Sequence, residues 1–279
     1  MPRLPGKTSY TLTAASLAFM LAAACSTSPS PAPAAPPPAG PKPTVVLVHG
    51  AWAETSSWDG EVQELQKQGY VARAIPNPLD GLLPDAESVK DFLATIHGPI
   101  VLVGHSYGGA VITNAAAGNP NVKALVYIDA VAPAIGETNI ALIGEKSALA
   151  GKSDDELYDK VSYPGAPEGA SKLYLKRDAF LKDFGSDLPA DVADRLWAGQ
   201  RAVSTIAFST PTAAAAWTTI PSWFFISSGD QIITAGSKEQ MAARAQSHIT
   251  HFDGGSHLTL ISHPDAVTKT IDEAASSLS

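Results

Sequence analysis

The sequence is poor in cysteine and in basic side chains. A single cysteine, Cys25, occurs among 279 residues, so no disulfide can form within one chain. Lys and Arg total 19 against 27 Asp and Glu, and the formal net charge is −8. A chain of this sign lacks the basic surface that binds nucleic acid or anionic lipid, so neither is expected as a partner. With 45% hydrophobic residues and no internal repeats, the chain can bury the core of one compact domain.

An apolar segment near the N-terminus is too short for a comfortable transmembrane helix, which needs about 20 apolar residues. It runs from Thr11 to Ala24 and follows two basic residues, Arg3 and Lys7. This arrangement is typical of a secretory signal. Residues 1–24 are therefore predicted to be a signal peptide, and the protein is predicted to be exported.

Cys25 stands where this apolar segment ends. Its placement resembles a bacterial lipoprotein signal, which implies diacylation of Cys25 and attachment to the cell envelope by a lipid anchor. The sequence departs from the usual lipobox, because Ala22 occupies the position where leucine is usual. The alternative is ordinary cleavage after Ala24, which would give a secreted or periplasmic protein. Apart from this possible anchor, no membrane contact is expected.

Residues 25–43 are nearly all Pro, Ala and Ser. Such a composition cannot bury enough apolar surface to fold and favours an extended chain, so this segment is predicted to be a tether. The globular domain is then predicted to cover residues 44–279.

Short apolar runs alternate with helical patterns through this domain. The runs are Val45–Val48, Val71–Ile75, Ile100–Val103, Ala124–Ile128, Trp223–Ile226 and Ile249–Phe252, and the helical patterns lie at 61–68, 85–96, after Ser106, at 238–245 and from Pro264. Continuous apolar strands separated by helices predict an α/β fold with a mostly parallel, doubly wound sheet covered on both faces. Functional side chains are then expected at the carboxyl ends of the strands.

The alternation stops over about residues 131–220, between the fourth and fifth apolar runs. Helical patterns at 154–161, 173–184 and 191–198 occupy this stretch. We interpret it as a helical cap inserted over the sheet before the late strands, not as a separate domain.

The segment Gly104-His105-Ser106-Tyr107-Gly108 follows the third apolar run and precedes a helix of small residues. A nucleophile on a sharp strand-to-helix turn needs residues without a Cβ two places before and two places after it, and Gly104 and Gly108 meet that need. The backbone N–H of Tyr107 would lie at the start of the helix, where the helix dipole favours a developing oxyanion. Ser106 is therefore a candidate nucleophile.

The chain resembles the α/β-hydrolases. Val48-His49-Gly50-Ala51-Trp52, taken with Gly104 to Gly109, is similar to the methylesterase and hydroxynitrile-lyase branch and its bacterial serine esterase relatives. The resemblance covers residues 44–279 and implies a Ser106 nucleophile, an acid after the strand that ends at Ser227, and a histidine after the last strand. Asp230 and His257 occupy those two places.

The residues around these two positions favour the same roles. Of seven histidines, His257 follows Gly254, Gly255 and Ser256 in a loop directly after a strand, from which a base can reach a serine hydroxyl. Asp230 follows Ser228 and Gly229 at the end of a strand, where a carboxylate could orient the imidazole. Asp129 is the rival acid because it also ends an apolar run, and Asp253 is a weaker one.

The second oxyanion donor is expected to be the N–H of Ala51, because Gly50 lets the loop after the first strand fold back toward Ser106. Trp52 is expected either to line the acyl pocket or to pack under the cap.

These residues predict a serine esterase that cleaves small-molecule esters through an acyl-enzyme, with no metal and no organic cofactor. Two alternatives stay open. One is a cyanohydrin lyase on the same scaffold, for which the resemblance implies a cap lysine that holds cyanide; the candidates are Lys152, Lys160, Lys172, Lys176 and Lys182. The other is a ligand-binding protein that uses the pocket without turnover. A dehalogenase or epoxide hydrolase is disfavoured because a serine replaces the aspartate nucleophile of those enzymes.

Overall fold

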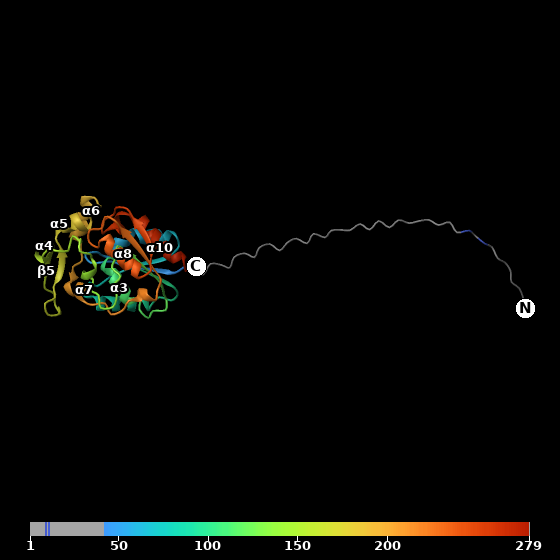
Figure 1. Ribbon diagram of the computed structural model, residues 1–279, viewed down its shortest axis with the longest axis horizontal. Helices are drawn as coiled ribbons and strands as arrows, with labels where there is room; N and C mark the ends of the chain where they lie inside the picture. Colours follow the sequence, from blue (N-terminus) through green and yellow to red (C-terminus); the bar gives the residue numbers. More distant parts are fainter. Residues whose placement is uncertain (1–8, 10, 12–41, 279) are drawn as a thin grey trace, which may run out of the picture. The chain divides into compact units, whose positions relative to one another are not determined.

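The computed structural model describes residues 9, 11 and 42–278 of the chain (Figure 1). Nearly all of the predicted signal peptide, Cys25 and most of the predicted tether lie outside the described residues. Among the residues described, no helix has the length and apolar character needed to cross a membrane.

The main sheet has six strands in the order β2-β1-β3-β4-β8-β9, and every neighbouring pair is parallel. The strands are β1 (Thr44–Val48), β2 (Val71–Ile75), β3 (Ile100–His105), β4 (Val122–Ile128), β8 (Ser222–Ser227) and β9 (His248–Phe252). All six residues of β3 are buried. Because successive side chains of a strand point to opposite faces, both faces of the sheet are covered there. The predicted α/β fold and its strands are confirmed.

The longer helices outside the segment between β4 and β8 pack on the sheet, and all but the last of them connect strands. They are α1 (Asp59–Lys67), α2 (Leu82–Leu93), α3 (Tyr107–Ala115), α8 (Ala235–Arg244) and α10 (Pro264–Ser276). Helix α2 packs against α3, and α1 packs against α10. Short helical segments η1 (Thr55–Trp58) and α9 (Thr259–Ser262) precede α1 and α10.

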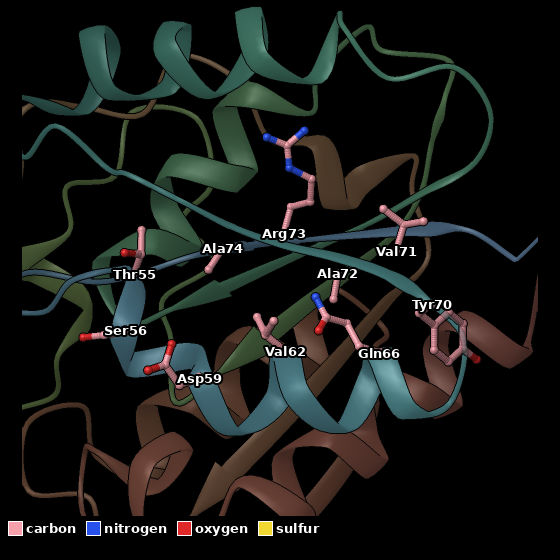
Figure 2. A pocket seen from close by; sticks show the side chains of 10 residues that line it. All are labelled: Thr55, Ser56, Asp59, Val62, Gln66, Tyr70, Val71, Ala72, Arg73 and Ala74. Carbon is pink, nitrogen blue, oxygen red and sulfur yellow. The ribbon is translucent and has the colours of Figure 1, made fainter.

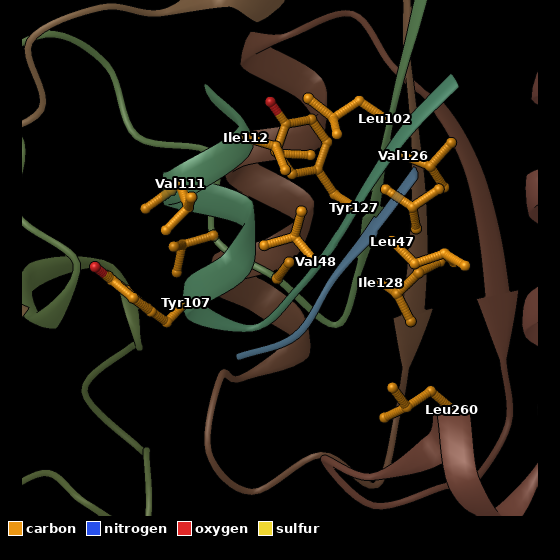
Figure 3. Close-up of a cluster of buried hydrophobic side chains, with 14 of the residues drawn as sticks. Leu47, Val48, Leu102, Tyr107, Val111, Ile112, Val126, Tyr127, Ile128 and Leu260 are labelled. Atoms are coloured by element: carbon orange, nitrogen blue, oxygen red, sulfur yellow. The ribbon is translucent and has the colours of Figure 1, made fainter. Parts of the chain in front are cut away.

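The core beneath α3 fixes the position of the strand ends that carry the site. Leu102 and Tyr127 lie on the face of the sheet toward α3, whereas Leu47, Val126 and Ile128 lie on the opposite face (Figure 3). Tyr127 is fully buried, and its hydroxyl forms a hydrogen bond of 2.9 Å with that of Thr113 on α3. The central strands and α3 therefore form one packed unit.

The segment between β4 and β8 forms the cap, whose elements α4, β5, α5, α6 and α7 gather at one end of the domain (Figure 1). Its helices are η2 (Ile140–Leu142), α4 (Asp154–Leu157), α5 (Arg177–Ala179), η3 (Phe180–Phe184), α6 (Ala190–Ala198), α7 (Thr205–Ser209) and η4 (Ala216–Thr218). Its strands β5 (Tyr158–Val161), β6 (Lys172–Leu175) and β7 (Val203–Ser204) form an antiparallel sheet in the order β5-β6-β7.

The sequence pattern predicts a helical cap, but the cap of the structure also contains the three strands β5, β6 and β7. The helix expected at 154–161 ends at Leu157 and continues as β5, and the one expected at 173–184 begins as β6. In β6, Leu173 and Leu175 are buried and Tyr174 between them is exposed, which is the two-residue period of a strand. The pattern expected at 191–198 is α6.

A surface depression of about 610 Å³ lies between α1 and the edge strand β2 (Figure 2). Gln66 projects into this region from α1 and Tyr70 lies at one end, whereas the Arg73 side chain points away from α1 toward the ring of Phe92 on α2. Its lining contains none of the candidate residues at the carboxyl ends of the strands. It is thus a feature of the sheet edge, separate from the Ser106 region.

Glu61 on α1 is fully buried, and neither carboxylate oxygen has a hydrogen-bond partner within the described residues. Burial raises its pKa well above the ordinary range, and the neighbouring Asp265 and Asp59 add to the rise. A carboxyl group whose pKa is higher in the folded state costs stability as the pH rises from the unfolded pKa toward the folded one.

We therefore expect Glu61→Gln to raise the thermal unfolding temperature at about pH 8, by about 2–4 °C for each kcal/mol regained. Near or below about pH 4, where the carboxyl is protonated in both states, the two proteins should unfold together. Glu87→Gln is the matched control, because Glu87 is an exposed partner of Lys90 and its replacement should change little at either pH. Destabilisation by Glu61→Gln at about pH 8 would contradict the expectation.

Candidate active site

Ser106 lies at the turn between β3 and α3 with φ 55° and ψ −125°. This left-handed conformation is strained for a residue with a side chain. The neighbouring glycines make it possible: a Cβ on Gly104 would lie 2.6 Å from the carbonyl oxygen of Gly108, and one on Gly108 would lie 2.5 Å from that of Val48. The local sequence thus raises the serine at the carboxyl end of the central strand.

The structure brings Ser106, His257 and Asp230 together. Ser106 Oγ lies 2.7 Å from His257 Nε2, and His257 Nδ1 lies 3.0 and 3.1 Å from the two carboxylate oxygens of Asp230. The side chains of His257 and Asp230 are fully buried, and Ser106 is only 7% exposed. A proton on Nδ1 held by the carboxylate leaves Nε2 free to accept the serine proton.

Backbone hydrogen bonds hold the two loops that carry Asp230 and His257 against each other. Ser228 N–H donates to the carbonyl oxygen of Phe252 at 3.0 Å, and Gly229 N–H donates to that of Gly254 at 2.9 Å. Gly254 and Gly255 take φ values of 92° and 69°, which favour glycine and turn the chain toward the sheet. The spacing of the acid and the histidine is therefore set by the loops after β8 and β9.

His105, next to the nucleophile, supports the site through the backbone of His257. Its Nε2 lies 2.8 Å from the carbonyl oxygen of His257, so an N–H at Nε2 donates to that carbonyl. Burial lowers the pKa of His105 well below the usual range, and the nearby His257 adds to this, which keeps the His105 ring neutral. The sequence places His105 beside Ser106 but gives no signal of this second contact.

Lys238 on α8 is a site residue that the sequence analysis does not identify. It is fully buried, and its Nζ donates to Asp129 Oδ1 at 2.5 Å and to Asp230 Oδ2 at 2.8 Å. The rival acid Asp129 also accepts hydrogen bonds from the N–H and Oγ of Ser227, at 2.8 and 2.6 Å. Asp129 thus pairs with Lys238 and Ser227, whereas Asp230 contacts both Lys238 and His257. No sequence pattern distinguishes Lys238 from an ordinary exposed lysine of a helix.

The charges around Asp230 keep it ionised. Burial alone would raise its pKa, but the adjacent His257 and Lys238 outweigh burial and hold the pKa well below the ordinary range. Two further hydrogen bonds, from the N–H groups of Ile232 and Ile233 at 2.8 and 3.1 Å, stabilise the carboxylate. Burial lowers the pKa of Lys238, but Asp129 and Asp230 together hold it above the ordinary range. The third candidate acid, Asp253, lies on the surface with Ser228 Oγ at 3.1 Å.

The two expected oxyanion donors both lie beside Ser106. Tyr107 is the first residue of α3, so its N–H has no acceptor within the helix. Ala51 follows Gly50, and a Cβ on Gly50 would lie 2.6 Å from Ser106 Cβ, which shows how closely this loop approaches the serine. Ala51 and Tyr107 line the same cavity as Ser106.

That cavity measures about 20 Å³, which is room for one water molecule. It is lined by Ala51, Trp52, Ser106, Tyr107, Asn139, Ile140, Ile143, Leu149, Tyr158, Phe208, Ile232 and Ile233. An open depression of about 430 Å³ lies outside it and shares four of these residues, namely Ile140, Ile143, Leu149 and Tyr158. The shared side chains form the wall between the cavity and the depression.

Trp52 lies both in the wall of the Ser106 cavity and under the cap. It lines the cavity, and its Nε1–H donates to the carbonyl oxygen of Leu173 in the cap at 3.0 Å. Its ring stacks on Tyr158, with centroids 5.6 Å apart. Trp52 therefore joins the loop after β1 to the cap while forming part of the cavity wall.

None of the five cap lysines is among the described residues that line this cavity. They lie instead in surface contacts, of which the pairs Lys152–Asp183, Lys160–Asp154, Lys172–Asp80, Lys176–Asp159 and Lys182–Asp178 are examples. Within the described part of the chain, no cluster of three or more His, Cys, Asp or Glu side chains is arranged to hold a metal ion.

Comparison with known proteins identifies the family. The model of the alpha/beta hydrolase family matches residues 45–270. The chain belongs to the alpha/beta hydrolase family. This alpha/beta hydrolase is 28% identical over 257 residues to an alpha/beta hydrolase of Aspergillus novofumigatus, a match that covers 84% of this chain and 97% of the relative.

A second relative and a solved structure agree with this assignment. The hydrolase is 31% identical over 182 residues to the pyrethroid hydrolase of Sphingobium wenxiniae, which covers 60% of this chain and 63% of the relative. The crystal structure of polyneuridine aldehyde esterase superposes with a TM-score of 0.71 at 15% identity, covering 84% of this chain and 98% of that one. The structural likeness shows the shared fold, and the family makes hydrolysis the class of reaction to expect.

Proposed function

We propose that this alpha/beta hydrolase is a serine esterase that cleaves uncharged carboxylic esters of small molecules through an acyl-enzyme. The observation that carries the proposal is the continuous hydrogen-bonded chain from Ser106 through His257 to Asp230. The cavity adds support, because no charged side chain is found among the described residues that line it. The name of the pyrethroid hydrolase relative is consistent with a small apolar substrate.

In the first half of this mechanism, His257 Nε2 accepts the Ser106 proton while Ser106 Oγ forms a bond to the ester carbonyl carbon. The N–H groups of Ala51 and Tyr107 and the N-terminus of α3 stabilise the negative charge on the former carbonyl oxygen. The bond from carbon to the alcohol oxygen then breaks, and His257 returns its proton to the departing alcohol. Asp230 stays ionised and stabilises the imidazolium.

In the second half, a water molecule attacks the acyl carbon and gives one proton to His257. Collapse of the second tetrahedral intermediate releases the carboxylic acid, and His257 returns the proton to Ser106 Oγ. The protein is regenerated with no net change in charge. Lys238 touches neither ester nor water in this scheme; it holds Asp230 in place through their 2.8 Å contact.

A series of p-nitrophenyl esters from acetate to decanoate tests the proposal. We expect saturable release of p-nitrophenol, with kcat/KM of about 10⁴ M⁻¹s⁻¹ or more for the best member. The acyl-chain length with the highest kcat/KM shows how long an acyl group the cavity accepts when the cap side chains move. Rates no higher than spontaneous hydrolysis for every member, from protein with an intact cooperative unfolding transition, would contradict the esterase proposal.

We also propose that the protein is exported and that Cys25 carries the lipid anchor. The basic residues before the apolar segment and the position of Cys25 at its end support this proposal. The mass of the mature N-terminus distinguishes a diacylated Cys25 from a chain cleaved after Ala24 with an unmodified cysteine.

A further inference from the structure

Asn139 places an unpaired amide in the wall of the Ser106 cavity. It precedes η2 in the cap, and its carbonyl oxygen accepts a hydrogen bond of 3.0 Å from Leu142 N–H. The residue is only 4% exposed and lines the same cavity as Ser106 and Tyr107. Its Nδ2 has no hydrogen-bond partner within the described residues.

Two other polar side chains of the cavity wall, those of Trp52 and Tyr107, donate to partners outside the cavity. Trp52 Nε1–H donates to Leu173 in the cap, and the Tyr107 hydroxyl donates to Asp85 at 2.7 Å. A buried amide without a partner lowers stability, and an apolar side chain of similar size in its place would avoid that loss. An unpaired donor in an apolar cavity is typical of a group that a ligand completes.

We infer that Asn139 is a specificity-determining residue whose Nδ2–H donates to a hydrogen-bond acceptor of the substrate. This inference rests on the proposed esterase function. The substrate class is an uncharged, largely apolar ester with a second acceptor, an ether or carbonyl oxygen, besides the scissile carbonyl. The apolar remainder of the ester would contact Ile140, Phe208 and Ile232.

The chemistry of the site argues against two other roles for this amide. The attacking water must use an oxygen lone pair on the acyl carbon, so a donor bonded to that oxygen would oppose the attack. The negative charge on the scissile oxygen already has the N–H groups of Ala51 and Tyr107 as expected donors. The remaining partner for the Asn139 Nδ2–H is a hydrogen-bond acceptor elsewhere on the substrate, away from the attacking water and the scissile oxygen.

Two pairs of esters of matched length test the inference. In the first, p-nitrophenyl methoxyacetate is compared with the butanoate, and in the second the 3-methoxypropanoate is compared with the pentanoate. Each pair exchanges one CH₂ for an ether oxygen. The quantity measured is the kcat/KM of the ether ester divided by the kcat/KM of its alkyl counterpart. Comparing this ratio between the parent and a variant cancels the intrinsic reactivity of the esters.

We expect Asn139→Leu to lower this ratio about 10-fold in at least one pair, because it removes the donor but keeps the volume. Asn139→Ala should lower it in the same pair. The unfolding temperature of Asn139→Leu should equal or exceed that of the parent, since a buried unpaired amide is lost.

Asn114→Leu is the matched control. Asn114 on α3 has a partly buried amide whose nitrogen and oxygen both have partners: its Nδ2 donates to the carbonyl oxygen of Ala110 at 2.8 Å, and its Oδ1 accepts from the N–H groups of Ala213 and Ala214 at 3.0 Å each. It is not part of the cavity lining, so its replacement should lower the unfolding temperature and leave both ratios unchanged.

An unchanged ratio in Asn139→Leu would overturn the inference. If both members of each pair lose kcat/KM by the same factor, the result would also point to a role of Asn139 on the oxyanion or the water. If the parent hydrolyses neither these four esters nor any member of the acetate-to-decanoate series, the esterase proposal fails instead. Calorimetry then measures the affinity of each ester for Ser106→Ala and for the double variant Ser106→Ala with Asn139→Leu, without turnover. If the ratio of affinities of the ether and alkyl esters is the same in both proteins, the role of Asn139 is overturned.

Discussion

Replacement of Ser106 with alanine is expected to lower kcat for ester hydrolysis by about 10⁴-fold or more. The substitution removes the oxygen that lies 2.7 Å from His257 Nε2 and leaves the backbone of the turn in place. A fluorophosphonate probe should label the parent protein on Ser106 and leave Ser106→Ala unlabelled, because the probe needs an activated serine oxygen. The substitution removes one buried oxygen, so the unfolding temperature should change little.

Ser209→Ala provides the comparison, because Ser209 is an exposed serine of α7 outside the cavity. It should retain both the rate and the labelling of the parent. Equal labelling of the parent and of Ser106→Ala would show that another residue is the nucleophile.

Replacement of Asp230 with asparagine is expected to lower kcat/KM by about 10⁴-fold, whereas Asp129→Asn should lower it by about tenfold at most. In the first variant an amide faces His257 Nδ1 and no longer stabilises the imidazolium or holds the correct tautomer. In the second, the contact of 3.0 Å between Asp230 and His257 is kept. The two variants therefore differ in rate at about pH 8.

Both variants should be less stable than the parent, because each removes one of the two carboxylates that neutralise the buried Lys238. Breaking a buried ion pair costs about 3–5 kcal/mol. Thermal unfolding measured beside kcat/KM separates this shared loss of stability from the loss of rate. A large rate loss in Asp129→Asn with little loss in Asp230→Asn would reassign the acid to Asp129.

The sequence predicts the main sheet and the strand-to-helix turn at Ser106. The inner strands β1, β3, β4 and β8 are buried over nearly their whole length and read as apolar runs. The edge strand β2 alternates exposed and buried residues, and its bounds match the predicted residues 71–75. Gly104 and Gly108 are needed wherever Ser106 is raised on such a turn, since the clash with a Cβ arises from residues close in sequence or in the adjacent strand. Local sequence suffices for these features.

The cap and the surroundings of the acid depend on contacts between distant segments. Four residues such as Tyr158–Val161 satisfy a helical pattern as readily as a strand, and pairing with β6 decides between them. Lys238 lies 109 positions from Asp129, and only the packing of α8 on β8 brings them together. Asn139 belongs to a loop without periodicity, so its buried and unpaired amide becomes visible only once the cavity is built.

The wall shared by the small cavity and the outer depression has a consequence for the course of a turnover. The 20 Å³ cavity has room for about one water molecule, so the proposed ester can reach Ser106 only after side chains of the cavity wall move; Ile140, Ile143, Leu149 and Tyr158 face the outer depression as well. Admission of the substrate and release of the acid are therefore steps with barriers of their own. The turnover number then depends on how fast these apolar side chains move as well as on the rate of the chemical step.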